Sequence, residues 1–201
     1  MPDLVASLSK ERIAVIVAHQ DDESLWFGGL LSSLPVGTVA HLINVCAPTP
    51  GRPDTHTRDA AFDRVATRLG AHPHHLSLPN VRANQDAEAE GLVPEVTAAI
   101  GKFLDSVLVT AVLSHGAHGE PCRVYKNGHA MHKAVSAACN HVCAVRGISW
   151  VFGCRGLPDT IGAVVKYDSA KKKILLDEYL PQWSPKGYPA YNEERYCVSW
   201  G

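Results

Sequence analysis

The amino-acid sequence predicts an α/β fold, a three-layer sandwich with a mainly parallel, Rossmann-like sheet. Short apolar runs rich in β-branched residues alternate along the chain with segments of helical periodicity, a pattern typical of strands that are each followed by a helix. The composition, with 46% hydrophobic and 19% charged residues, is typical of a globular chain. Because 201 residues supply one sizeable core and no repeat or linker divides them, we expect a single domain over residues 1–201.

The expected elements follow from the period of the apolar residues. Strands are predicted where the apolar runs are short, at residues 12–18, 38–46, 74–78, 108–114, 149–154 and 160–167. Helices are predicted where apolar residues recur at helical spacing, at residues 23–34, 55–69, 92–106, 129–146 and 169–180. Pro35 should end the first helix, while Thr55 caps the second and Gly70 closes it. The last twenty residues, rich in aromatic residues and proline, are expected to wrap the surface.

Charge and cysteine content exclude several classes of protein. The net charge is −1 with no long run of one sign, which argues against binding to nucleic acid or to a membrane surface. The first residues have neither a basic start nor an uninterrupted apolar core, so we expect no signal peptide and no membrane span. None of the six cysteines forms a C-x-x-C pair, and reduced thiols in the cytoplasm are favoured over disulfides or a thiolate zinc site.

Polar loops follow three of the predicted strands. These loops read AHQDDES from residue 18, CAPTPGR from residue 46 and SHGAHGE from residue 114. In open α/β sheets, ligands bind beyond the carboxyl ends of the strands. The three loops should therefore converge on one edge of the sheet and form the functional site there.

The residue types in these segments indicate a metal site. The candidates are His19, Asp21, Asp22, His129 and His132. A histidine and an aspartate three residues apart on one tight turn can both reach one ion, and a third ligand plus water completes a catalytic zinc site. The other aspartate is then available to take a proton from the activated water. A helix N-terminus would also favour the clustered acids but does not explain His19. Spacing alone does not distinguish His129 from His132 as the third ligand.

Several motifs together resemble the PIG-L/LmbE-like family of zinc-dependent N-acetylglucosaminyl deacetylases. AHQDDES with the following Gly28, Gly29 and Leu30, then SHGAHGE and NGHAMHKAV, match a signature of A-H-P-D-D-E with a later G-H-x-x-H. HHLSLPN and KKKILLDEYLPQW are similar to later family segments, so the resemblance runs from about residue 12 to residue 183. It implies the LmbE-like deacetylase fold.

The resemblance also implies a set of metal ligands. His19, Asp22 and His132 would hold Zn²⁺. Two imidazole nitrogens and one carboxylate also accept Fe²⁺ or another divalent ion.

The resemblance assigns catalytic roles to further residues. Asp21 would be the general base, and His129 would either stabilise the tetrahedral oxyanion or protonate the leaving amine. Arg58 would hold a polar group of the substrate. Amide hydrolysis requires this combination of a base, a Lewis acid and a proton donor.

The chain departs from the family pattern at several positions around the expected pocket. Gln20 stands where the family has proline, and Asn80 where aspartate is common. We expect Gln20 and Glu120 to contact substrate; alternatively, Glu120 orients a histidine or faces solvent. The segment 121–127 is longer than in many members, which leaves the identity of the substrate open.

The predicted function is metal-dependent removal of an acyl group, an acetyl group in particular, from an N-acylated amino sugar or its conjugate. The alternatives are an amidase of the same fold acting on a non-sugar amine or thiol conjugate, and a non-catalytic carbohydrate-binding relative. Asp21 and His129 argue against the last, because binding alone needs neither a base nor an acid. The chain is short beside longer family members, so we expect an open pocket or one completed by a second copy in a homo-oligomer.

Overall fold

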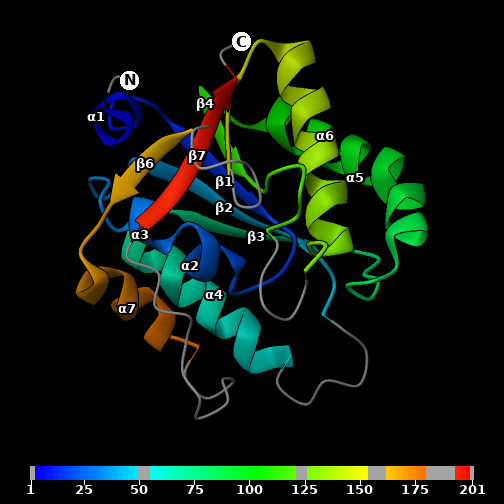
Figure 1. Cartoon of the computed structure of the whole chain (residues 1–201), viewed down its shortest axis with the longest axis horizontal. Coiled ribbons are helices and arrows are strands. Elements are labelled where there is room, and N and C mark those ends of the chain that lie inside the picture. Colours follow the sequence, from blue (N-terminus) through cyan, green and yellow to red (C-terminus); the bar gives the residue numbers. More distant parts are fainter. Residues whose placement is uncertain (1–2, 49–54, 121–125, 154–161, 180–192, 200–201) are drawn as a thin grey trace.

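The fold was obtained as a computed structural model, in which a central sheet separates two layers of helices (Figure 1). The structure describes residues 3–48, 55–120, 126–153, 162–179 and 193–199. The predicted α/β sandwich with a mainly parallel sheet is confirmed.

The elements follow one another in the predicted alternation of strands and helices. The strands are β1 Ile13–Val17, β2 Val39–Cys46, β3 His72–Leu78, β4 Ala111–Ser114, β5 Ser149–Gly153, β6 Ala163–Lys166 and β7 Glu193–Ser199. The helices are α1 Leu4–Leu8, α2 Asp22–Trp26, α3 Gly28–Leu31, α4 Thr55–Leu69, α5 Asp86–Ser106, α6 Ala130–Arg146 and α7 Ser169–Asp177. Among the helices that the structure describes, none combines the length and apolar composition needed to cross a membrane.

The sheet places β1 at the point where the strand order reverses. The order is β3-β2-β1-β4-β5-β7-β6, and β1 pairs in parallel with both β2 and β4. The chain therefore leaves β1 toward one side of the sheet on the way to β2 and reaches β4 on the other side. A crevice opens at such a switch point beyond the carboxyl ends of the strands, and residues 18–24 occupy that position.

Alternate side chains of β1 serve two separate cores. Ile13, Val15 and Val17 pack into the layer formed by α1 to α4 and α7. Ala14 and Ile16 face the opposite layer, formed by α5 and α6 (Figure 1). All five residues are fully buried, which explains why β1 reads as a continuous apolar run.

The prediction that the last twenty residues wrap the surface is wrong for the part that the structure describes. Of the last twenty residues, the described part forms β7, which lies inside the sheet and pairs antiparallel with both β5 and β6. Glu194 and Tyr196 are buried on one face of this strand. The sequence did not predict this strand, because the charged residue Glu194 occupies an inward position and breaks the usual alternation of apolar and polar residues.

Two helices also differ from the prediction. The helix expected at residues 23–34 is divided at Phe27, whose φ of −124° and ψ of −2° interrupt the turn between α2 and α3. The helix expected from residue 92 begins at Asp86, and Pro94 lies inside it rather than in its first turn. Pro94 is exposed, so the carbonyl that loses its helical partner can be solvated instead.

The cysteine prediction is only partly correct. Cys46, Cys139 and Cys143 are buried reduced thiols, as expected. Cys197 in β7 is disulfide-bonded, which contradicts the expectation of thiols throughout. The cytoplasmic location stays a prediction.

Candidate functional site

The turn after β1 has a strained backbone at its centre. Asp21 has φ 91° and ψ −24°, a region that residues with a side chain seldom adopt, and α2 begins at the next residue. The backbone N–H of His19 donates to Asp22 Oδ2 at 2.8 Å, which closes the turn. Residues held in such conformations cluster at functional sites. The turn brings His19 and Asp22 together beyond the end of β1, as the sequence predicted.

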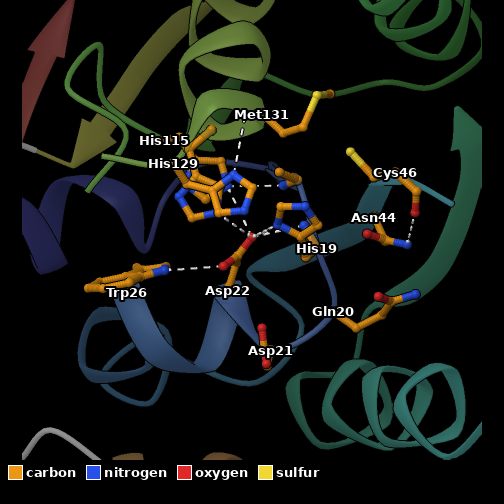
Figure 2. Close-up of polar contacts among 12 residues, drawn as sticks. His19, Gln20, Asp21, Asp22, Trp26, Asn44, Cys46, His115, His129 and Met131 are labelled. Atoms are coloured by element: carbon orange, nitrogen blue, oxygen red, sulfur yellow. Dashed lines mark hydrogen bonds and ion pairs between the residues drawn. The ribbon is translucent and has the colours of Figure 1, made fainter. Parts of the chain in front are cut away.

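Imidazole nitrogens converge on one oxygen of Asp22 (Figure 2). Asp22 Oδ2 lies 3.2 Å from His19 Nδ1, 3.1 Å from His132 Nε2 and 3.5 Å from His115 Nε2. In two overlapping trios, His19–His129–His132 and Asp22–His115–His132, all ligand atoms lie within 4.8 Å of one another. We refer to these five residues together with Glu120 as the histidine–carboxylate cluster. It has the donor atoms to hold a divalent metal ion such as Zn²⁺.

Two separations around Asp22 can be compared with those of a zinc site, although the predicted set of His19, Asp22 and His132 is not itself one of the two trios. Bond lengths of about 2.0–2.2 Å in a tetrahedral zinc site separate neighbouring donor atoms by about 3.4 Å. The observed separations of 3.1 and 3.2 Å from Asp22 Oδ2 are close to that value. The second nitrogen of each ring is also anchored: His19 Nε2 lies 3.1 Å from Asn80 Oδ1, and His132 Nδ1 lies 3.0 Å from Glu120 Oε2. Metal-binding histidines are typically oriented in this way.

His115 has a different role, because its nitrogens are already engaged. The backbone N–H of Ala18 donates to His115 Nε2 at 3.0 Å, so the ring proton resides on Nδ1. His115 Nδ1 in turn donates to Glu120 Oε2 at 2.7 Å. The ring stacks on that of His132 with centroids 4.0 Å apart. His115 therefore braces Glu120 and His132, a role that the sequence did not assign, although its place directly after a predicted strand could have signalled it.

His129 begins α6 and lies against two of the predicted ligands. Its Nδ1 accepts the backbone N–H of Met131 at 3.3 Å, and its ring centroid is 4.6 Å from that of His19 and 4.7 Å from that of His132. Burial, together with the charges of His19 and His132, lowers the pKa of His129 to about 3. The ring is therefore neutral and carries its proton on Nε2. This favours donation of a hydrogen bond over release of a proton.

Asp21 lies beside the cluster, and Arg58 holds its carboxylate. Figure 2 shows the Asp21 side chain below Asp22 and apart from the imidazole rings. Arg58 Nη2 donates to Asp21 Oδ2 at 2.7 Å and also to the carbonyl oxygen of Gln20. Burial raises the pKa of Asp21 to about 8, although Arg58 opposes the rise. Arg58 thus reaches the site through Asp21, and its predicted contact with substrate stays a prediction.

Gln20 and Glu120, the other two residues predicted to contact substrate, form hydrogen bonds with other parts of the protein. Gln20 is buried, and its Nε2 donates to Asp59 Oδ1 at 2.6 Å. Glu120 is 3% exposed and accepts hydrogen bonds from both His115 and His132, and from the backbone N–H of Gly116 at 2.8 Å. Of the alternatives for Glu120, the geometry corresponds to orienting a histidine.

The segment 121–127 lies only partly within the described structure. Arg123 and Tyr125 of this segment fall outside the described residues. Lys126 is described and exposed.

The titration behaviour of the cluster reflects its crowded charges. Burial alone would lower the pKa of His132, but Asp22 and Glu120 outweigh it and raise that pKa to about 10. Burial alone would raise the pKa of Asp22, but the charge of His132 and the hydrogen bond from that ring hold the pKa of Asp22 well below its usual range. In the metal-free protein a proton on His132 therefore occupies the position that a cation would take.

Solved structures with this architecture are distant in sequence. No known protein family matches the chain as a sequence, and no curated protein is significantly similar to it. The A40926 pseudoaglycone deacetylase Dbv21 superposes with a TM-score of 0.68 at 19% identity, covering 94% of this chain and 97% of its own. The N,N'-diacetylchitobiose deacetylase of Pyrococcus horikoshii gives 0.67 at 12% identity, covering 98% and 87%. This chain has the deacetylase fold.

The same fold also accommodates a different reaction. The 4-carboxy-2-hydroxymuconate hydratase of Pseudomonas putida superposes with a TM-score of 0.52 at 12% identity, covering 94% of this chain and 97% of its own. At such identities the likeness concerns the fold alone, so the reaction has to be argued from the site.

Proposed function

We propose that this protein is a metal-dependent N-deacetylase that removes an acetyl group from an N-acylated amino sugar or its conjugate. The observation that carries the proposal is the convergence of two anchored imidazoles on Asp22 Oδ2, with a second buried carboxylate, Asp21, at the preceding position of the chain. A binding site alone would not require that additional carboxylate. The fold shared with two deacetylases supports the same reaction class.

The metal would be held by His19, Asp22 and His132. Their N₂O donor set suits Zn²⁺ and also accepts Fe²⁺ or another divalent ion. Asn80 and Glu120 would fix the orientation of the two rings. When bound, the ion would polarise the amide carbonyl and increase the acidity of water.

The surrounding residues supply the proton transfers. Asp21 in its ionised form accepts a proton as the water oxygen bonds to the carbonyl carbon, and because burial raises its pKa to about 8, this form is gained as the pH rises toward and above 8. His129 donates its Nε2–H to the developing oxyanion. The C–N bond then breaks and the protonated Asp21 returns its proton to the leaving nitrogen. The products are a carboxylic acid and an amine, and the acid's remaining proton passes to the amine to give a carboxylate and an ammonium ion. Arg58 keeps Asp21 in place throughout.

The choice of an amino-sugar substrate rests on the deacetylases that share the fold. One of them acts on N,N'-diacetylchitobiose and the other on a pseudoaglycone. Water addition to an unsaturated acid is the second candidate, because the hydratase shares the architecture.

The proposal is tested by metal analysis of the purified protein followed by a substrate screen. N-acetylglucosamine, diacetylchitobiose, a plain N-acetylated amine and an unsaturated dicarboxylic acid are each incubated with the metal-loaded protein. We expect released acetate from an acetylated sugar, loss of that release with a chelator, and its recovery on adding Zn²⁺ or Fe²⁺. Acetate from the plain amine alone would favour the general amidase. Consumption of the unsaturated acid without acetate release would replace the deacetylase by the hydratase.

A further inference from the structure

Trp26 contacts the carboxylate at the centre of the cluster. It follows Asp22 by four residues, one helical turn along α2, and its indole Nε1–H donates to Asp22 Oδ1 at 3.1 Å (Figure 2). The two oxygens of Asp22 therefore have different partners. Oδ1 accepts the indole, whereas Oδ2 faces His19 and His132.

The indole is held firmly enough to orient what it touches. Trp26 packs against the core on the α2 side of the sheet, and its ring lies 6.5 Å from that of His132 with the planes 74° apart. The Tyr196 hydroxyl oxygen lies 3.3 Å from the backbone carbonyl oxygen of Trp26, while its single proton is directed at Glu194, so Trp26 is held mainly by packing. An aromatic ring fixed by packing on one side is a stiff support for the carboxylate on the other.

A carboxylate without such a support can turn about its terminal bond and present either oxygen or both. We propose that Trp26 is a positioning residue that holds Asp22 so that only Oδ2 faces the metal donors. This inference rests on the proposed metal site. It completes a pattern, because Trp26 fixes Asp22 as Asn80 fixes His19 and Glu120 fixes His132.

The test compares Trp26→Phe with Trp150→Phe. Phenylalanine keeps an aromatic ring and removes only the N–H donor together with part of the ring volume. Trp150 is a matched control, because it lies in β5, is 6% exposed, and its Nε1 has no hydrogen-bond partner among the described residues. Both variants lose packing, but only Trp26→Phe removes the bond to Asp22.

Metal affinity is measured by competition with a chelator for Zn²⁺ and Co²⁺, together with the visible absorption of bound Co²⁺, which reports the number of donor atoms. We expect Trp26→Phe to weaken binding about 10–100-fold and to change the Co²⁺ spectrum. Trp150→Phe should leave both unchanged while lowering the thermal midpoint of the metal-free protein.

The outcomes separate this inference from the proposed function. Wild-type affinity and spectrum in Trp26→Phe would overturn the positioning role and leave the metal site standing. Equal losses in both variants would overturn it as well, because general destabilisation would then explain the effect. A wild-type protein that binds neither ion would overturn the proposed metal site itself. If Trp26→Phe does not fold, the wild-type indole N–H resonance of Trp26 should still shift on adding Zn²⁺, and no shift would contradict the inference.

Discussion

Two buried clusters of charged side chains contact α2, and they are satisfied in different ways. In the lysine–glutamate cluster, the Glu194 carboxylate accepts Lys172 Nζ at 2.7 Å, the backbone N–H groups of Gly29 and Leu30 at 2.8 Å each, and the Tyr196 hydroxyl. Lys172 also donates to the carbonyl oxygen of Leu25 at 2.8 Å. One positive and one negative charge are thus fully paired, and they tie α7, β7 and the start of α3 together.

The histidine–carboxylate cluster depends on an added proton or metal ion for its positive charge. Its buried carboxylates, Asp22 and Glu120, share His132, whose pKa is raised to about 10, so that the ring is protonated at neutral pH. Ring nitrogens of His19 and His132 point at the same oxygen of Asp22 instead of each meeting a separate partner. The comparison teaches that a buried charged cluster complete in itself joins elements, whereas one whose ring nitrogens converge is suited to bind an ion.

The largest expected effect is on the rate of the reaction, and it distinguishes a role of Asp21 in proton transfer from a role in metal binding. Asp21→Asn should lower kcat by about 10²–10⁴-fold, because the substitution removes the proton acceptor but none of the proposed metal donors. Initial rates of acetate release and metal content are measured together, with the exposed Asp63→Asn on α4 as a control. A loss of bound metal equal to the loss of rate would show that Asp21 is a ligand rather than the base.

Breaking the lysine–glutamate cluster should affect stability and not metal binding. Lys172→Met leaves Glu194 buried without its cation and should lower the free energy of unfolding by about 3–5 kcal/mol. The double variant Lys172→Met with Glu194→Gln should recover part of that loss, because no unpaired charge remains. Denaturant unfolding and chelator competition check the two claims, and a weakened metal affinity in the folded single variant would contradict the separation of the clusters.

Removing the supporting carboxylate of Glu120 from the histidine–carboxylate cluster should weaken metal binding rather than stability. Glu120→Gln keeps the shape but weakens the acceptor of the His132 Nδ1–H, so metal affinity should fall about 10–100-fold. The control is Glu95→Gln, an exposed glutamate on α5. Unchanged affinity in Glu120→Gln would show that His132 does not depend on this bond.

The proton on His132 should compete with the metal. Because the pKa of His132 is raised to about 10, the ring carries a proton at pH 7 that a metal on Nε2 has to displace. We expect release of about one proton per metal ion and an affinity that rises about tenfold for each unit of increasing pH near neutrality. Calorimetric titrations in buffers of different ionisation enthalpy measure the released protons, and binding without proton release would contradict this assignment.

The smallest effect concerns an ion pair outside both clusters. Burial alone would raise the pKa of Glu178, but hydrogen bonds from Arg64 and Arg68 on α4 outweigh it and lower that pKa. Its stabilisation should therefore be present above the unfolded value of 4.5 and be lost as the pH falls through the folded pKa. Glu178→Gln should cost about 0.5–1 kcal/mol at pH 7 and nothing in acid. Thermal midpoints across pH test this, and an equal difference at every pH would refute it.

The sequence predicted the fold well where local pattern dominates. The apolar run of β1, the bounds of β2 and α4, and the order of strands and helices all follow from residues close together in the chain. The break at Phe27 and the inclusion of β7 in the sheet were not predicted. Both depend on contacts with distant segments, such as the Glu194 carboxylate at the start of α3.

By itself, the sequence determined that histidines and aspartates would meet at the carboxyl ends of the strands, because strand direction and turn position are local properties. Only the tertiary structure decided which atom faces which. His115 accepts a hydrogen bond from the backbone N–H of Ala18, which lies 97 positions earlier in the chain, and Arg58 donates one to Asp21, 37 positions earlier. Such pairings depend on strand register and helix packing, which no local period encodes, and they distinguish a metal donor from the side chains that support it.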